Sequence, residues 1–92
     1  MLRIVSSNHF KKDLKLAKKR GLDLTLLENT VNLLASGQQL PPSYRDHPLK
    51  SDLKDFRECH IKPDWLLIYR IDNEILELYL FRTGTHSDLF KK

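Results

Sequence analysis

The chain has 92 residues, 40% of them hydrophobic and 30% charged, and a formal net charge of +4. This length predicts a single domain over residues 1–92, and the composition excludes a disordered or fibrous protein. No apolar run approaches the ~20 residues that a membrane-spanning helix needs, and residues 1–5 lack the pattern of a signal peptide, so we expect a cytoplasmic protein without a membrane partner. Cys59 is the single cysteine, which excludes an intramolecular disulfide and a cysteine-based zinc cluster.

The N-terminal part of the sequence predicts a strand followed by two helices. Residues 2–5 are typical of a short strand, and the serines that follow can cap a helix. Apolar residues then recur at helical spacing in two segments. Gly21 ends the first helix, Asp23 can cap the second, and Gly37 ends the second. The predicted inner faces are Phe10, Leu14 and Ala17 in the first helix and Leu24, Leu27, Val31 and Leu34 in the second. We therefore expect a helical hairpin that covers one face of a sheet.

The outer face of the first helix carries much of the positive charge. From Lys11 to Arg20 the chain has six basic residues and one acid, Asp13. Helical spacing places four lysines together, and we call them the lysine face: Lys11, Lys15, Lys18 and Lys19. A concentrated patch of this kind favours a phosphate-rich partner, and a simple solvated surface is the ordinary alternative.

The second half of the sequence predicts a loop followed by three strands. Residues 38–50 hold three of the four prolines, so we expect an ordered loop there. Strand-compatible residues run from Leu53 to His60, and apolar strands run from Trp65 to Ile71 and from Ile75 to Phe81. The chain leaves the last strand through Gly84 into a short turn. This order predicts an α+β fold, in which a small, mostly antiparallel sheet of about four strands packs against the two N-terminal helices. We expect the functional cleft on or beside the other face of the sheet.

Groups that can transfer protons lie around the predicted strands. The set consists of His47, His60, Asp64 and His86, with two arginines, Arg57 and Arg82, and two aromatic residues, Trp65 and Phe90. Cleaving RNA without a metal requires a base for the 2′-hydroxyl, an acid for the departing 5′-oxygen, and fixed cations for the phosphate charge. Imidazole and guanidinium groups can supply these functions, so the set is typical of a site that cuts RNA.

Three motifs follow one another along the chain. They are Asp46–Leu49 (DHPL), Arg57–Trp65 (RECHIKPDW) and Arg82–Phe90 (RTGTHSDLF). Together they resemble the YafQ branch of the RelE superfamily of bacterial toxins, and the resemblance covers nearly the whole chain. The chain departs from many relatives at Ser51–Leu53, where they have a glycine and an aromatic residue. The resemblance implies a ribosome-dependent mRNA endonuclease, the toxin of a type II toxin–antitoxin pair, with an antiparallel sheet packed against two helices.

The resemblance also implies roles for the matching residues. Acid–base catalysis would fall to His47, His60, Asp64 and His86. Arg82 and Phe90 would support the reaction. From their own chemistry, we expect phosphate or substrate to be bound by Arg82, Arg57, Trp65 and Phe90, and ribosomal RNA by the charge of the lysine face. In the implied reaction a base drawn from His47, His60 and Asp64 activates the 2′-hydroxyl, Arg82 stabilises the phosphate, and His86 protonates the leaving oxygen. The expected partners are a cognate antitoxin, the ribosome and mRNA, with operator DNA bound only through the antitoxin complex. No cofactor and no metal are expected.

Several residues have simpler alternative interpretations. Trp65 is equally compatible with the core, and Phe90 with holding down the C-terminal tail. Cys59 is expected in the core rather than as a nucleophile, because neighbours on a strand point to opposite faces. A zinc site built from the histidines and Asp64 lacks a recognised ligand spacing.

Two other functions also remain open. One is a non-catalytic homologue that acts as a nucleic-acid-binding and antitoxin-binding repression module. The other is a nuclease that cuts free RNA without the ribosome.

Overall fold

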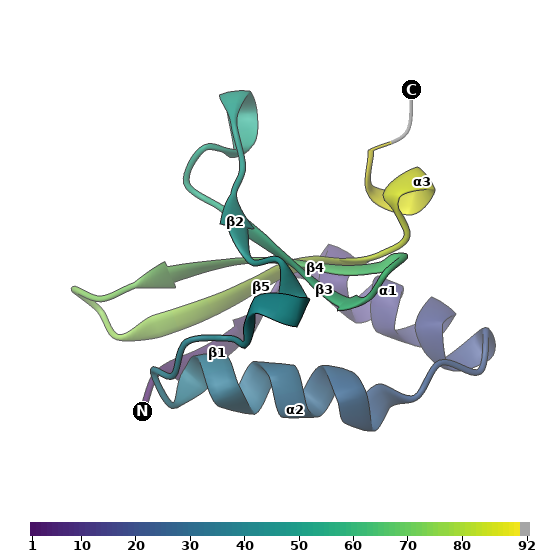
Figure 1. The fold of residues 1–92 in the computed structure, drawn as a ribbon, viewed down its shortest axis with the longest axis horizontal. Helices are drawn as coiled ribbons and strands as arrows, with labels where there is room; N and C mark the ends of the chain where they lie inside the picture. The colour runs from purple at the N-terminus through teal and green to yellow at the C-terminus, as the bar shows by residue number, and fades with distance from the viewer. Residues whose placement is uncertain (91–92) are drawn as a thin grey trace.

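The computed structural model describes residues 1–90, and its centre is one five-stranded sheet in the order β1-β5-β4-β3-β2 (Figure 1). The strands are β1 (Arg3–Ser6), β2 (His47–Pro48), β3 (Arg57–Lys62), β4 (Trp65–Asp72) and β5 (Glu77–Gly84). β1 pairs with β5 in parallel, and the other pairs are antiparallel. The predicted α+β class is confirmed. The sheet has five strands rather than about four because His47 and Pro48, expected in a loop, pair with Glu58 and Arg57.

Two helices cover one face of the sheet (Figure 1). α1 (Asn8–Lys19) begins after Ser7, and α2 (Leu24–Ala35) begins after Asp23; each capping side chain accepts a hydrogen bond from a backbone N–H of the first turn. The predicted caps and helix ends are therefore confirmed, with Gly21 and Gly37 just beyond the two C-termini. In the described part of the chain no helix is long and apolar enough to cross a membrane.

The hydrophobic core lies between these helices and the sheet. Alternate residues of β4 point towards the helices, namely Trp65, Leu67 and Tyr69. They meet Phe10 of α1 and Leu27, Val31 and Leu34 of α2. Leu67 is fully buried, and burial of such a side chain stabilises the fold by about 1.5–3 kcal/mol. The predicted inner faces of both helices are thus the faces that build the core.

The opposite face of the sheet carries two short projections (Figure 1). One is the connection between β2 and β3, which contains the 3₁₀ helix η2 (Ser51–Leu53), and the other is α3 (His86–Leu89). A second 3₁₀ helix, η1 (Pro42–Tyr44), precedes β2. We call the face that carries these projections the open face, and it holds the candidate functional groups.

Two strands begin two or more residues later than the sequence predicts. β5 begins at Glu77 rather than at Ile75, because the side chain of Asp72 accepts hydrogen bonds from the N–H groups of Glu74 and Ile75 and closes a turn. Ile75 is consequently 59% exposed. β3 begins at Arg57 rather than at Leu53, because the intervening segment forms η2.

The short turn predicted after β5 is the helix α3, and two polar contacts fix it. Thr85 and Asp88 form a capping box, in which each side chain accepts a hydrogen bond from the backbone N–H of the other. Asp88 also accepts two hydrogen bonds from Arg20 at the end of α1, at 2.7 and 3.2 Å. At Gly84 the φ angle is +155°, and an added Cβ would lie 2.9 Å from the Asp88 carboxylate. Glycine at this position therefore allows α3 to pack back over the sheet.

Gly84→Ala should destabilise the fold and displace α3. The substitution imposes both a strained backbone angle, worth roughly 1–3 kcal/mol, and a clash with Asp88. Chemical denaturation measures the loss. Gly21→Ala is the matched control, because Gly21 also has a positive φ, +77°, but an added Cβ there meets no atom within 4 Å. Equal losses for the two variants would show that the contact with Asp88 does not require a glycine.

Candidate functional site

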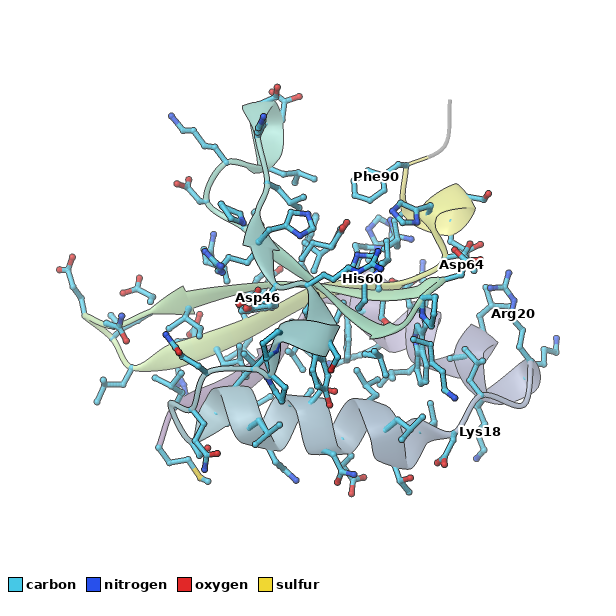
Figure 2. All side chains as sticks on the ribbon, viewed as in Figure 1. Lys18, Arg20, Asp46, His60, Asp64 and Phe90 are labelled. Carbon is cyan, nitrogen blue, oxygen red and sulfur yellow. The ribbon has the colours of Figure 1, made fainter. Side chains whose placement is uncertain are left out.

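Three histidines from three separate segments form a line on the open face. His47 lies in β2, His60 in β3, and His86 is the first residue of α3. The ring centroids of His47 and His60 are 6.3 Å apart, and those of His60 and His86 are 6.0 Å apart. The ring of Phe90 extends the line, 6.1 Å from His86, and Figure 2 shows His60 and Phe90 on the side of the sheet away from α2. The structure thus brings together all three histidines that the sequence singled out.

The line follows from strand pairing and from one turn. β2 pairs with β3 so that His47 lies opposite Glu58. Because side chains alternate along a strand, Glu58 and His60 share the open face, whereas Cys59 between them points into the core. A register shift between His60 and Lys62 marks the bend before β4. The turn at Gly84 then returns the chain so that His86 reaches His60.

Glu58 is a buried carboxylate between two of these histidines, and the sequence-based prediction missed it. The residue is 4% exposed. Its Oε1 lies 3.3 Å from Nε2 of His47 and 3.8 Å from Nε2 of His60. The signal in the sequence was its position two residues before His60, which predicts the same strand face. A buried carboxylate needs a cationic or donor partner, and the imidazole of His47 is near enough to be that partner.

The other ring nitrogens of the same histidines also face acceptors. Nδ1 of His47 lies 2.7 Å from the carbonyl oxygen of Arg45, and Nδ1 of His60 lies 3.3 Å from that of Pro63. An imidazole with an acceptor at each nitrogen can donate to both only when it is doubly protonated. Glu58 therefore lies between His47 and His60, closer to His47, and places a negative charge beside both rings.

Asp64 and His86 lie together in a more exposed part of the site. Oδ1 of Asp64 is 3.8 Å from Nδ1 of His86, beyond hydrogen-bond distance, and the two side chains are 74% and 55% exposed. Solvent therefore screens their attraction. The exposure also means that a bulky substrate can reach both groups.

Arg82 pairs with a carboxylate that the sequence-based prediction did not assign to the site. Its Nε and Nη2 donate to Asp13 of α1 at 2.8 and 3.1 Å, and the backbone N–H of Thr83 donates to the same carboxylate. These hydrogen bonds raise the pKa of Arg82 above its usual value. Asp13 thus fixes the guanidinium at the edge of β5 and offsets its charge.

Arg57 lies away from the histidine line. It shares a strand face with Cys59, which points into the core, and donates to Asp46 at 3.3 and 3.4 Å. The hydroxyl of Tyr69 donates to the same carboxylate at 2.6 Å. Burial and this carboxylate raise the pKa of Tyr69. The Arg57–Asp46–Tyr69 cluster therefore attaches the DHPL loop to the sheet.

The two aromatic candidates have different environments. Trp65 is 3% exposed in the core, and its Nε1 donates to the hydroxyl of Thr83 at 3.0 Å. Phe90 is 40% exposed and lies beside His86. Phe90 can therefore contact a substrate on the open face, whereas Trp65 packs on the helix side.

Cys59 has the environment expected of a core residue. It is fully buried, and burial raises the pKa of its thiol to about 12, so that a thiolate nucleophile is strongly disfavoured. Among residues 1–90, no group of three or more histidine, cysteine, aspartate and glutamate side chains is arranged to hold a metal ion.

The lysine face is exposed along α1, as its spacing predicted. Within the described residues, none of its four lysines forms an ion pair, whereas the neighbouring Arg20 is paired with Asp88 and Asp13 is paired with Arg82. The free positive charge of α1 is therefore concentrated on the lysines.

Comparisons with known proteins agree with this fold. The family model described as bacterial toxin of type II toxin-antitoxin system, YafQ, matches residues 2–91. Two proteins named mRNA interferase toxin YafQ, from Escherichia coli strains B/BL21-DE3 and K12, are 45% and 42% identical to this chain over 85 residues. Each alignment covers 91% of this chain and 90% of the relative.

Solved structures show the same similarity. A metal-bound toxin from Helicobacter pylori is 56% identical, with a TM-score of 0.92 over 98% of this chain and 100% of that chain. YafQ in the Escherichia coli DinJ–YafQ complex is 43% identical, with a TM-score of 0.90 over 98% and 99%. Fold and sequence together define a toxin of a type II toxin–antitoxin system. The chain belongs to the YafQ family of these toxins.

The ion pair that fixes α3 predicts a pH dependence of stability. The hydrogen bond from Arg20 holds the pKa of Asp88 well below its usual range, so the stabilisation is fully present above the unfolded pKa of about 4 and is lost as the pH falls below it. Asp88→Asn should lower the melting temperature at pH 7, and the difference from the wild type should shrink below about pH 4. Glu28→Gln, on the exposed side of α2, is the control. A difference that stays constant from pH 7 to pH 2 would contradict the role of this pair.

Proposed function

We propose that the protein is a ribosome-dependent mRNA endoribonuclease that cleaves RNA by acid–base catalysis. Membership of the YafQ family makes the chain an mRNA interferase, an enzyme that cuts messenger RNA internally. The observation that carries the finer proposal is the histidine line, with ring centroids 6.3 and 6.0 Å apart on the open face of the sheet. Imidazoles at this spacing can supply a base and an acid on two sides of one phosphate.

His60, which lies between His47 and His86, is the preferred source of the base. His60 lies on one side of His86, and Asp64 lies 3.8 Å from His86 itself. If His86 protonates the leaving 5′-oxygen, the base must act from the opposite side of the phosphate, which favours His60 or His47 over Asp64. Asp64 then orients His86 or contacts the substrate. The base removes the proton of the 2′-hydroxyl, which attacks the phosphorus.

The products follow from this attack. The new bond from the 2′-oxygen to phosphorus replaces the bond to the 5′-oxygen, which leaves as a 5′-hydroxyl after His86 donates its proton. The other fragment ends in a 2′,3′-cyclic phosphate or in the 3′-phosphate formed by its hydrolysis. The cationic forms of the imidazoles would supply most of the positive charge at the phosphate, and Arg82, whose charge Asp13 offsets, would add less.

The ribosome supplies what this small chain lacks. In-line attack requires the 2′-hydroxyl to be held in a defined orientation, and the open face offers few groups that could impose it on a flexible RNA. A message held in the decoding site is already ordered. The lysine face lies on α1, on the helix side of the sheet, so it can bind ribosomal RNA while the open face meets the message.

A cognate antitoxin is the expected regulator. The comparison structure of the DinJ–YafQ complex, a toxin with its partner, supports such a partner here. A mainly positive α1 surface suits a partner with an acidic or amphipathic segment. Operator DNA would then be bound through the antitoxin complex rather than by this chain alone.

His86→Ala should slow single-turnover cleavage on programmed ribosomes by about 10² to 10⁴, the usual effect of removing a positioned proton donor. The side chain is 55% exposed, so the melting temperature and the affinity for ribosomes should change little. A message with a 5′-bridging phosphorothiolate should recover much of the loss, because sulfur leaves without protonation.

His9→Ala is the matched control for His86→Ala, because His9 is an exposed histidine on α1, away from the line. Full activity of His86→Ala on an ordinary message would remove His86 from the mechanism. A slow variant without recovery on the sulfur substrate would make His86 a base or an orienting group instead of the acid.

Replacing the four residues of the lysine face with glutamine should weaken ribosome binding and flatten its dependence on salt. Each lysine that contacts a phosphate contributes roughly 0.7 to 0.9 to the slope of log affinity against log salt concentration. Binding measured from low to high salt tests this. The control is the double variant Lys50→Gln, Lys54→Gln on the connection between β2 and β3. The change in slope is divided by the number of charges removed, so that the two variants can be compared. An unchanged slope would show that the lysine face is a solvated surface that does not contact RNA.

A further inference from the structure

A pocket of about 320 Å³ lies beside the histidine line, between the C-terminal end of α1, the start of β4, the end of β5 and the start of α3. Its walls are mainly apolar and include Leu16, Leu22 and Trp65. Arg20 and Asp64 also line it, and Figure 2 shows both at the same end of the molecule. The volume is near the lower end of the range for small-molecule sites, so the pocket suits one small planar group.

The pocket is next to the proposed reaction centre. Asp64 lines it and also lies 3.8 Å from Nδ1 of His86. Gly84 and Thr85, which lead into α3, line it as well. An RNA strand whose scissile phosphate lies at His86 therefore passes the mouth of the pocket with an adjoining nucleotide.

One of the four carboxylates around the pocket is available to a ligand. Three are already engaged: Asp13 by Arg82 and Thr83, Asp23 by Thr25, and Asp88 by Arg20 and Thr85. Asp64 is 74% exposed, and within residues 1–90 its one ion-pair contact is the distant one with His86. A carboxylate accepts hydrogen bonds and donates none, so Asp64 suits an exocyclic amino group of a base.

The surroundings of the pocket favour RNA over a protein side chain. Asp88 holds the guanidinium of Arg20 with two hydrogen bonds, and bases stack on fixed guanidinium groups as they do on aromatic rings. Leu16, 40% exposed, lines both this pocket and an adjoining hollow formed with Lys15, Lys18 and Lys19. The apolar slot thus adjoins the cationic surface of the lysine face, which draws RNA rather than a neutral partner to this end of the molecule.

We propose that this pocket receives one base of the cleaved mRNA, adjacent to the cut, and that Asp64 favours a base with an exocyclic amino group. The proposal rests on the proposed function and extends it from where the chain cuts to which nucleotide it accepts beside the cut.

The test combines a protein variant that blocks the pocket with messages that lack one base. Leu16→Trp fills the mouth of the pocket, and Ile75→Trp, at another exposed apolar position in the β4–β5 turn, is the matched control. Single-turnover cleavage on ribosomes is measured with messages that carry one abasic nucleotide. It is placed in turn at the nucleotide before the cut and at the nucleotide after it. For the wild type and Ile75→Trp, one abasic position should slow cleavage by about 5- to 150-fold, the effect of losing one stacked base. Leu16→Trp should be slow on the intact message and insensitive to that position.

A second substrate tests the role of Asp64. Two messages are compared at the position where an abasic nucleotide slows the wild type. One carries adenosine there, and the other carries the adenosine analogue that lacks the exocyclic amino group. The wild type should slow by roughly tenfold, as expected for the loss of a hydrogen bond to a charged group, whereas Leu16→Trp should not respond. An equal rate for the wild type on both substrates would remove the base selectivity assigned to Asp64.

The outcomes separate this inference from the proposed function. If the wild type does not cleave the intact message on ribosomes, the proposed function fails. If the wild type cleaves, but Leu16→Trp and the abasic substitutions act independently at every position, the pocket does not bind a base and this inference alone fails. Loss of antitoxin affinity in Leu16→Trp with unchanged cleavage would make the pocket a protein-docking site and would also overturn it.

Discussion

Carboxylates, more than apolar contacts, hold the groups of the candidate site in place. β2 has two residues and α3 has four, so neither buries enough apolar surface to be fixed by packing. Asp46 attaches the loop before β2 through Arg57 and Tyr69, Glu58 lies between His47 and His60, and Asp88 ties α3 to α1 through Arg20. In the described chain no buried side-chain nitrogen or oxygen lacks a hydrogen-bond partner, which is the condition under which such carboxylates are tolerated. The short elements that carry His47 and His86 therefore depend on carboxylate contacts for their position, whereas strand pairing places His60.

This use of acids changes where free positive charge is found. The chain has six arginines, and four of them, Arg3, Arg20, Arg57 and Arg82, are paired with carboxylates within residues 1–90. The lysines of α1 are not paired in this way. The positive charge that is free to contact a phosphate backbone therefore lies on the helix side, whereas the candidate groups of the open face are mainly imidazoles. Such a division suits a protein that binds a large RNA with one face and acts on a second strand with the other.

The two helices were predictable because their signals are local. Side chains three or four residues apart meet on one helix face, so the spacing of Phe10, Leu14 and Ala17 determines which face of α1 is buried. Ser7 and Asp23 cap the first turns of the helices that follow them. The histidines were found because they occur within motifs at turns. The strand starts at Ile75 and Leu53 were wrong, because the turn closed by Asp72 and the 3₁₀ helix η2 compete with strand-forming residues. Glu58 and Asp13 were missed, because a charged residue on a strand or helix is ordinarily exposed and only its partners reveal a different role.

The sequence by itself determined the fold class and the inner faces of the helices and singled out the candidate proton-transfer groups, because periodicity and motif spacing are properties of neighbouring residues. The tertiary structure decided how those groups are used. Arg82 meets Asp13 across 69 positions of sequence, and Arg20 meets Asp88 across 68, so neither pair exists until α1 packs beside β5. The same packing forms the pocket beside Asp64. Contacts of this kind depend on the shape of the folded sheet, and for that reason the sequence identified the arginines but not the charges that they meet.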